Sequence, residues 1–421
     1  MVKFIHGADI HLDSPFLGLQ RYEGAPADRI IGAAREALRQ LVQVAIDEEA
    51  SFVIIAGDLF DGDLKDYNPV LFFRRQMSIL KDAGIRVFLI SGNHDAASHM
   101  SKKLGMPENV HIFSTKKPET IILQELCIAI HGQGFGRREI MENLAAHYPD
   151  AKGGFYNIGI LHTCANGLEG HEPYAPCKIE ELIAKGYDYW ALGHIHKRKI
   201  LHESPWIVFP GNIQGRHIRE NGPKGCSIVT VESDGTTSVE HRCLDILRWA
   251  YCVIDATGKE CVDDILDLVY SLLKKQLKES DGRMLAVRFE IIGACRSHEK
   301  LISNQDRWIN EIRAVATEMS NGEAYVERIL FNTSTYIDLG KLKENNNPLG
   351  HMLRFIDAIE SDDALFSELV KELEPLKCKL PFELRQGEGA IDMESREKML
   401  EILQDAQQLL VPRILAMGED G

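Results

Sequence analysis

The chain has 421 residues, of which 44% are hydrophobic and 26% are charged, a globular composition that excludes wholesale disorder and collagen and, at about 150 residues per domain, predicts two or three domains. Its formal net charge of −15 argues against a general affinity for nucleic acid, because such affinity comes largely from Lys and Arg. Nine cysteines without C-x-x-C spacing, and the absence of a long uncharged apolar run, predict a cytoplasmic protein without a disulfide framework or membrane segment.

The first 245 residues alternate short apolar runs with helical patterns. Six runs rich in β-branched or aromatic residues predict buried strands at 2–5, 52–56, 87–90, 157–161, 189–192 and 206–209. Apolar residues recur at helical spacing from Ile30 to Ile46, and a second helical pattern runs from Pro69 to Ala83. Strand–helix–strand crossovers of this kind predict a layered α/β domain. Two later runs, at 226–232 and 238–243, predict a hairpin.

The pattern changes near residue 246. Strand, helix, strand, helix and strand are predicted in turn at 249–254, 262–278, 284–292, 308–319 and 324–330. They give a smaller α/β cap domain over residues 246–338. We expect residues 339–421 to form a helical tail, which starts near the linker-like stretch K-E-N-N-N-P-L-G and carries apolar residues along one helix face. That face either packs on the cap or docks on a partner helix.

Side chains that bind metals follow five of the predicted strands. They are Asp9 and His11 after the first, Asp58 after the second, Asn93, His94 and Asp95 after the third, His162 after the fourth, and His194 and His196 after the fifth. Because the carboxyl ends of parallel strands lie along one edge of a sheet, we expect these residues to converge there. Oxygen and nitrogen donors without thiolate favour Mn, Fe, Zn or Ni in a hydrolytic site over a structural zinc.

The spacing within these clusters also favours metal binding. In D-x-H at 9–11 and H-x-H at 194–196, two ligands are separated by one residue, so in extended chain they point the same way. A glycine directly precedes three of the clusters, at positions 57, 92 and 193, where the missing side chain permits close backbone approach or positive φ. Two adjacent metals need a bridging carboxylate, and Asp58 is the predicted bridge.

In chain order the motifs read D-x-H, G-D-x-x-D, G-N-H-D, a later His and G-H-x-H. The series resembles the signature of calcineurin-like metallophosphoesterases and covers about residues 1–245. The resemblance implies a two-sheet β-sandwich flanked by helices and two divalent metal ions, with Mn²⁺ as the expected species. It implies that Asp9, His11, Asp58 and His196 hold one ion and that Asp58, Asn93, His162 and His194 hold the other. His94 and Asp95 are the implied catalytic residues: His94 faces the phosphate and Asp95 orients it.

The loop after the last metal motif, P-G-N-I-Q-G-R-H-I-R-E at 210–220, is similar to that of SbcD-type DNA exonucleases, especially the YhaO branch. The implied activity of the core, residues 1–245, is exonuclease or endonuclease hydrolysis at DNA ends in DNA repair, with a metal-bound hydroxide as nucleophile. Substrate contacts are expected from Asn212, Arg216 and Lys224, and the cap is expected to bind DNA. The resemblance also implies a homodimer and an SMC-like (SbcC/YhaN-type) ATPase bound to residues 339–421. This chain has no G-x-x-x-x-G-K-[ST] loop, so ATP use would be the partner's.

The sequence leaves two alternatives open. Between Lys197 and Lys224 six basic residues stand against two acidic ones, which favours DNA as substrate despite the net charge. A phosphodiesterase or phosphatase for nucleotides or small phosphate esters is the alternative enzyme. An interaction protein with a vestigial site is the other. One departure from archaeal and eukaryotic relatives concerns Asp61, which stands where they often carry a His, and we expect Asp61 to have only a supporting role.

Overall fold

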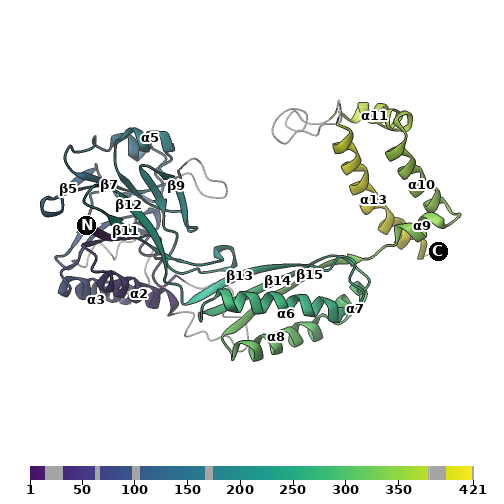
Figure 1. The fold of residues 1–421 in the computed structure, drawn as a ribbon, viewed down its shortest axis with the longest axis horizontal. Coiled ribbons are helices and arrows are strands. Elements are labelled where there is room, and N and C mark those ends of the chain that lie inside the picture. The colour runs from purple at the N-terminus through teal and green to yellow at the C-terminus, as the bar shows by residue number, and fades with distance from the viewer. Residues whose placement is uncertain are drawn as a thin grey trace. The chain divides into compact units, whose positions relative to one another are not determined.

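The structure, a computed structural model, describes residues 1–14, 32–61, 67–96, 105–165, 174–377, 379 and 395–419. These residues form a mixed α/β fold with three β-sheets and a set of C-terminal helices (Figure 1). The chain divides into two compact units, 1–253 with 266–290 and 306–330, and 254–265 with 291–305 and 331–421. The division passes through the third sheet. The expected fold class is confirmed.

The first sheet has six strands in the order β12-β11-β1-β2-β3-β4. Their bounds are β1 (Val2–Gly7), β2 (Phe52–Ala56), β3 (Arg86–Ile90), β4 (Val110–Ile112), β11 (Gly225–Val231) and β12 (Thr237–Cys243). Strands β1 to β4 run parallel, whereas β11 pairs antiparallel with both β1 and β12. The parallel β1, β2 and β3 therefore end at the same edge, and the predicted hairpin is present as β11 and β12.

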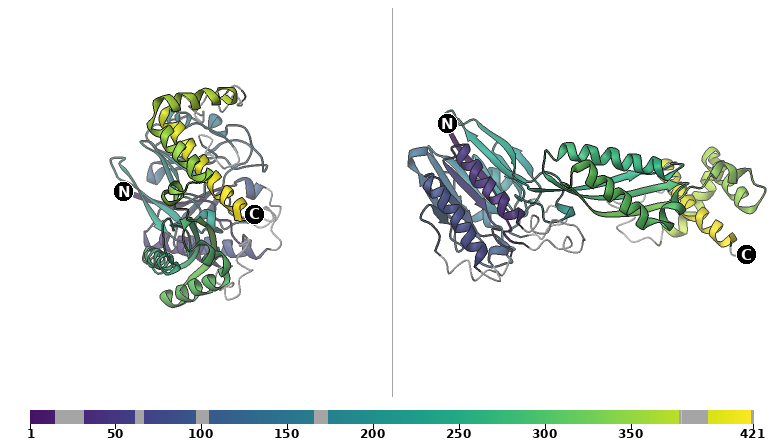
Figure 2. Two further views of the ribbon diagram at one scale, coloured as in Figure 1. Left: turned by 90° about the vertical axis from the view of Figure 1, so that its right-hand side faces the viewer. Right: turned by 90° about the horizontal axis from the view of Figure 1, so that it is seen from below.

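Two long helices cover the outer face of the first sheet. They are α2 (Ala33–Asp47) and α3 (Asn68–Asp82), which lie side by side as the purple and dark blue helices of Figure 2. Their buried faces repeat at helical spacing, as in Leu38, Leu41 and Val42 of α2, and pack with Val53 and Ile55 of the sheet. Both helices were predicted from this periodicity.

The second sheet also has six strands, in the order β5-β6-β7-β8-β10-β9. Their bounds are β5 (Glu119–Leu123), β6 (Ile128–Gly132), β7 (Tyr156–His162), β8 (Tyr189–Gly193), β9 (Lys199–Glu203) and β10 (Trp206–Phe209). Strands β6, β7, β8 and β10 are mutually parallel. The short elements η2 (Gln124–Leu126), η3 (Leu144–His147), α5 (Ile179–Ala184) and η4 (Ile218–Glu220) lie in the connections along the chain.

The two sheets face each other across a core of large apolar side chains. Phe4 stacks on Phe52 within the first sheet, with ring centroids 4.9 Å apart, and meets Tyr189 of the second sheet edge-on at 5.3 Å. All three are fully buried. Aromatic pairs in these geometries add to the stability that burial of their surface provides. The core therefore joins the sheets into the sandwich that the resemblance implied.

A third sheet, in the order β13-β14-β15, belongs to the middle of the chain. Its elements are β13 (Leu247–Asp255), α6 (Val262–Glu279), β14 (Met284–Cys295), α7 (His298–Ser303), α8 (Gln305–Ser320) and β15 (Ala324–Thr335). Figure 1 shows α6 and α8 along one face of this sheet. All three predicted strands and both predicted helices are present. Trp308 of α8 is buried.

The C-terminal helices are α9 (Leu339–Glu344), α10 (Pro348–Ser361), α11 (Asp363–Lys377) and α13 (Arg396–Glu419). Leu349 and Leu353 of α10 pack with Val411 of α13. The stretch K-E-N-N-N-P-L-G, which we expected to be a linker, is partly helical. Asn347 caps α10 by accepting a hydrogen bond from the N–H of Gly350, and Pro348 is the first residue of the helix. Among the described residues, no helix combines the length and apolarity needed to cross a bilayer.

The two sheets of the sandwich approach closely where β2 and β8 end. A Cβ atom on Gly193 would lie 1.9 Å from the carbonyl oxygen of Ala56 and 3.0 Å from Nδ1 of His162. That nitrogen lies 2.9 Å from the same carbonyl oxygen. A side chain on Gly193 would therefore push apart backbone and imidazole groups that are already in contact.

We predict that Gly193→Ala destabilises the protein by roughly 1–3 kcal/mol, the usual cost of overpacking a well-packed interior. Thermal unfolding followed by circular dichroism should give a lower melting temperature. Gly153→Ala is the matched control, because nothing lies within 4 Å of the Cβ it would add. A Gly193→Ala protein that melts with the wild type would contradict the close approach of the two sheets.

Candidate metal centre

The predicted ligands meet at the ends of both sheets rather than at the edge of one. Asp9 follows β1, Asp58 follows β2 and Asn93 begins the short helix α4 (Asn93–Ala96) after β3, all from the first sheet. His162 ends β7, and the H-x-H segment 194–196 follows β8, both from the second sheet. The sequence placed these groups at strand ends, but it took the sandwich to bring the two halves of the cluster face to face.

Several of these residues have left-handed backbone conformations. The φ angles are 51° at Asp9, 45° at His11, 51° at Asp58 and 104° at His194, a region that non-glycine residues adopt at a cost of about 1–3 kcal/mol. Backbone hydrogen bonds hold the strained segments together: the N–H of Asp9 donates to Gly57 and the N–H of His11 donates to Asp58, each at 3.0 Å. The surrounding fold thus fixes the direction of the side chains.

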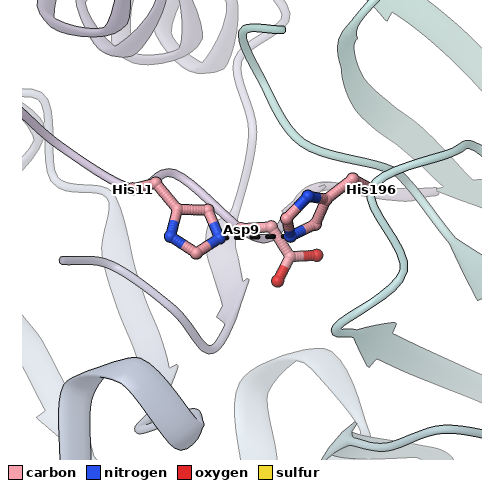
Figure 3. A group of neighbouring side chains, drawn as sticks. All are labelled: Asp9, His11 and His196. Atoms are coloured by element: carbon pink, nitrogen blue, oxygen red, sulfur yellow. Dashed lines mark hydrogen bonds between the residues drawn. The ribbon is translucent and has the colours of Figure 1, made fainter. Parts of the chain in front are cut away.

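The first group of donor atoms consists of Asp9, His11 and His196, whose ligand atoms lie within 4.8 Å of one another. Figure 3 shows the two imidazoles turned toward each other beside the carboxylate of Asp9, with their Nε2 atoms 3.1 Å apart. Asp9 and His11 are almost completely buried. Two ring nitrogens and a carboxylate directed at one point form a ready-made set of ligands for a cation.

The second group lies around Asp58. Nε2 of His162 is 2.9 Å from Oδ1 of Asn93 and 3.5 Å from Oδ2 of Asp58. The same Oδ2 atom is 3.8 Å from Nε2 of His11, which belongs to the first group. Asp58 is therefore within reach of both groups, as a bridging ligand must be.

His194 stands beside the cluster. Its ring centroid is 5.2 Å from that of His162, and its backbone N–H donates to both carboxylate oxygens of Asp9 at 3.0 Å. Among the described His, Cys, Asp and Glu residues, three overlapping triads have donor atoms within 4.8 Å of one another, and His194 is in none of them. The triads are drawn from Asp9, His11, Asp58, His94, His162 and His196. The ligand role predicted for His194 stays a prediction.

Burial and neighbouring charges shift the pKa values of the clustered groups. Burial favours the neutral form of Asp58, but the charge of His162 and its contact with the carboxylate outweigh burial and hold the pKa of Asp58 well below its usual range. Burial lowers the pKa of His11 to about 4, so this imidazole is neutral at pH 7 and keeps a lone pair for coordination. Although burial lowers it, the charge of Asp58 raises the pKa of His162 to about 9, so a cation bound there would have to displace a proton from this ring. Imidazole and carboxylate donors without sulfur fit a divalent cation such as Mn, Fe or Zn. The residues therefore fit the two ions that the motifs implied.

His94 lies at the more open side of this cluster, and Asp61 orients it. Nδ1 of His94 is 2.7 Å from Oδ1 of Asp61, and its ring is 4.9 Å from that of His11. The expectation that Asp95 orients His94 is wrong. The carboxylate of Asp95 instead accepts three backbone N–H groups, from Leu59, Phe60 and Gly92, and so ties the loops after β2 and β3 together.

Asp61 and His94 shift each other's charge states. The nearby ring of His11, with Nδ1 at 3.7 Å, and the hydrogen bond from His94 lower the pKa of Asp61, and the hydrogen bond to Asp61 raises the pKa of His94. Ser14 adds a further donor to Asp61 at 2.6 Å. The supporting role expected for Asp61 is thus a direct one, because its carboxylate fixes the ring and favours its protonated form.

The predicted substrate contacts are mostly turned into the protein. Asn212 is fully buried and donates to Gln214 and Glu220. Lys224 is 5% exposed and donates to the carbonyl oxygen of His196 at 2.7 Å. The Arg216 side chain keeps 15% exposure and pairs with Glu220 at 2.9 Å. Contact of these three residues with a substrate stays a prediction.

Glu220 is the residue at this site that the sequence did not identify. It lies in the basic loop, where the sequence shows it only as one of the two acidic residues between Lys197 and Lys224. The sequence offered one signal: Glu220 follows Arg216 by four residues in the same loop. Only the structure places its carboxylate 2.7 Å from Nδ1 of His196.

Two family models match the chain. The model described as calcineurin-like phosphoesterase matches residues 2–198, and the model described as the middle domain of the metallophosphoesterase YhaO matches residues 249–334. The first match contains every strand-end cluster from Asp9 to His196. The second contains the whole sheet β13-β14-β15 apart from its ends.

Known proteins are similar along much of the chain. An uncharacterized metallophosphoesterase, YhaO, of Bacillus subtilis (strain 168) is 33% identical over 414 residues, which cover 97% of each chain. The DNA double-strand break repair protein Mre11 of Methanopyrus kandleri is 22% identical over 354 residues, which cover 76% of this chain and 73% of that protein. Mre11 of Saccharolobus solfataricus is 29% identical over 207 residues, which cover 47% of this chain and 50% of that protein.

The domain match and the near full-length relative agree with the geometry of the site. Asp, Asn and His side chains from two sheets form a candidate divalent metal centre, and hydrolysis of phosphoesters with divalent metals is the chemistry of the matched domain. The chain belongs to the calcineurin-like metallophosphoesterases and, within them, to the YhaO family.

Proposed function

We propose that this chain is a metal-dependent DNA nuclease that hydrolyses phosphodiester bonds at DNA ends in DNA repair, with Mn²⁺ as its metal. The observation that carries the proposal is the similarity to the Mre11 protein of Methanopyrus kandleri over 354 residues. That similarity is longer than the match to the phosphoesterase model, residues 2–198. It therefore cannot come from the shared phosphoesterase domain alone.

The protein's own groups would handle the proton of the leaving oxygen. Asp61 holds Nδ1 of His94, and the His94 side chain is 32% exposed, more than the buried ligands beside it. In the charged form that Asp61 favours, Nε2 carries a proton that it would donate to the departing oxygen of a phosphodiester. Two bound divalent ions would supply activation of the attacking water and neutralisation of the phosphate.

Exposed cations next to the site favour a polyanionic substrate over a small one. Lys197 directly follows the metal-site residue His196, Lys199 begins β9 two residues later, and Arg219 directly precedes Glu220 in η4. All three cations are exposed. Although the whole chain has a net charge of −15, cations at this position would neutralise backbone phosphates of a nucleic acid.

We propose in addition that the protein forms a homodimer and that its C-terminal helices bind an SMC-like ATPase. Exposed apolar residues support both: Leu71 and Ile79 on α3, and Phe355, Leu376, Leu409 and Leu410 on the C-terminal helices. A monomer by light scattering would contradict the dimer. Failure to form a complex with such an ATPase in solution would contradict the second proposal.

His94→Gln should lower the rate of Mn²⁺-dependent cleavage by about 10²–10⁴-fold, the usual contribution of a general acid. Mn²⁺ binding should stay close to wild type, because the buried ligand nitrogens are unchanged. Cleavage of a linear duplex gives the rate, and calorimetric titration gives the binding. His147→Gln, an exposed histidine outside the cluster, is the control. Wild-type cleavage by His94→Gln would refute the assigned role.

A double variant, Lys197→Ala with Arg219→Ala, tests the DNA substrate. We expect weaker binding of a linear duplex and a salt dependence reduced by about 2 in slope, about one for each lost phosphate contact. Cleavage of a small aryl phosphodiester should be unchanged, since it has no backbone to engage these cations. Lys116→Ala with Lys117→Ala, another exposed pair, is the control.

Three outcomes separate the possible functions. Cleavage of duplex DNA that falls in the double variant supports the nuclease. Efficient cleavage of cyclic nucleotides or aryl phosphates without cleavage of DNA would instead support the phosphodiesterase or phosphatase alternative. No cleavage of any of these substrates with Mn²⁺ bound would contradict both.

A further inference from the structure

Glu220, the last residue of η4, has a carboxylate that points into the protein. The residue is 6% exposed although its neighbours Arg219 and Asn221 are exposed. Its oxygens meet donors from three residues: Nδ1 of His196 at 2.7 Å, Nδ2 of Asn212 at 2.9 Å, and the backbone N–H and Nη2 of Arg216 at 2.7 and 2.9 Å. A buried carboxylate with this many donors is a built feature of the loop.

The contact with His196 determines where that ring carries its proton. A carboxylate only accepts hydrogen bonds, so a distance of 2.7 Å requires a proton on Nδ1 of His196. Nη2 of Arg216 also lies 3.3 Å from this nitrogen and could donate to it only if Nδ1 were unprotonated. In that case the lone pair of Nδ1 would face the carboxylate of Glu220 at 2.7 Å, which is repulsive. Nδ1 is therefore the donor, and the neutral ring keeps its lone pair on Nε2.

That Nε2 atom is the one turned toward the metal centre. It lies 3.1 Å from Nε2 of His11, and the ligand atoms of His11, His196 and Asp9 are within 4.8 Å of one another. A metal-binding histidine usually donates its other ring N–H to a carboxylate or carbonyl group, which fixes its tautomer and orientation. Glu220 has the position and chemistry of such an acceptor for His196.

The groups around Glu220 match a carboxylate that only accepts hydrogen bonds. Asn212 and the backbone and guanidinium of Arg216 all donate to its two oxygens. A second contact holds the same ligand, because Nζ of Lys224 donates to the carbonyl oxygen of His196 at 2.7 Å. The loop 211–225 thus fixes His196 through both its ring and its backbone.

We infer that Glu220 is a positioning residue, which orients His196 and fixes its tautomer for metal binding. Asn212 and Arg216 act through Glu220, by satisfying its remaining acceptor sites and balancing its charge. This explains why two residues expected to contact substrate are instead held by a buried carboxylate. The inference rests on the metal centre and not on DNA as the substrate, so it is tested without any nucleic acid.

The first experiment measures Mn²⁺ binding to the full-length Glu220→Gln protein, by electron paramagnetic resonance of free Mn²⁺. Loss of an outer carboxylate partner of a metal-binding His typically weakens affinity by about 10- to 100-fold, and we expect a loss of that size at one of the two ions. Glu48→Gln is the matched control: Glu48 also pairs with two cations, Lys3 at 2.7 Å and Arg242 at 2.8 Å, but touches no ligand. Wild-type affinity at both ions in Glu220→Gln would overturn the inference.

A second measurement uses the wild-type protein and covers the case in which Glu220→Gln does not fold. Nitrogen-15 correlation spectra of the metal-free protein report which ring nitrogen of each histidine carries the proton, and His196→Gln identifies the signal of His196. We expect the Nδ1–H tautomer. The Nε2–H tautomer in the wild type would overturn the inference, whereas a merely structural role for Glu220 would leave the tautomer free to follow solution preference.

Discussion

Polar and charged side chains crowd together where the two sheets of the sandwich end. Two carboxylates, Asp9 and Asp58, and the ring nitrogens of His11 and His162 are buried with little access to water. Burying charge is costly unless it is paired or coordinates a metal. The chain holds these groups together with strained backbone and close glycine contacts, and a cation bound among them would offset the cost of burying them.

The sandwich gives the site its precision by coupling two independent sheets. Left-handed backbone at Asp9 and Asp58 comes from the first sheet, and the H-x-H segment 194–196 comes from the second. Gly193 lets the second sheet reach the backbone of Ala56 in the first. Around this centre, groups that are not themselves ligands set proton positions: Asp61 fixes His94 and Glu220 fixes His196. The site therefore contains carboxylates that orient its histidines as well as the residues that could bind the metal ions.

Much of the fold could be predicted from the sequence, because buried strands and amphipathic helices leave strong periodic patterns. The strands missed were β4, β5, β6 and β9. β4 has three residues, β9 is an edge strand, and only η2 separates β5 from β6. The motifs identified the cluster but not its orienting groups. Asp95 directly follows His94, whereas Asp61 belongs to the earlier G-D-x-x-D motif, and only the fold shows that Asp61 reaches the ring. Likewise, the sequence indicated only that Glu220 belongs to a basic loop, because the composition of a loop does not show which of its side chains point inward.

Anomalous X-ray scattering from crystals of the full-length protein grown with Mn²⁺ would locate the metal ions. We expect two peaks about 3.5–4 Å apart, the spacing of two-metal hydrolytic sites, with the carboxylate of Asp58 between them and Nε2 of His196 next to one of them. A single peak away from Asp58, or no peak at the meeting point of the two sheets, would contradict it.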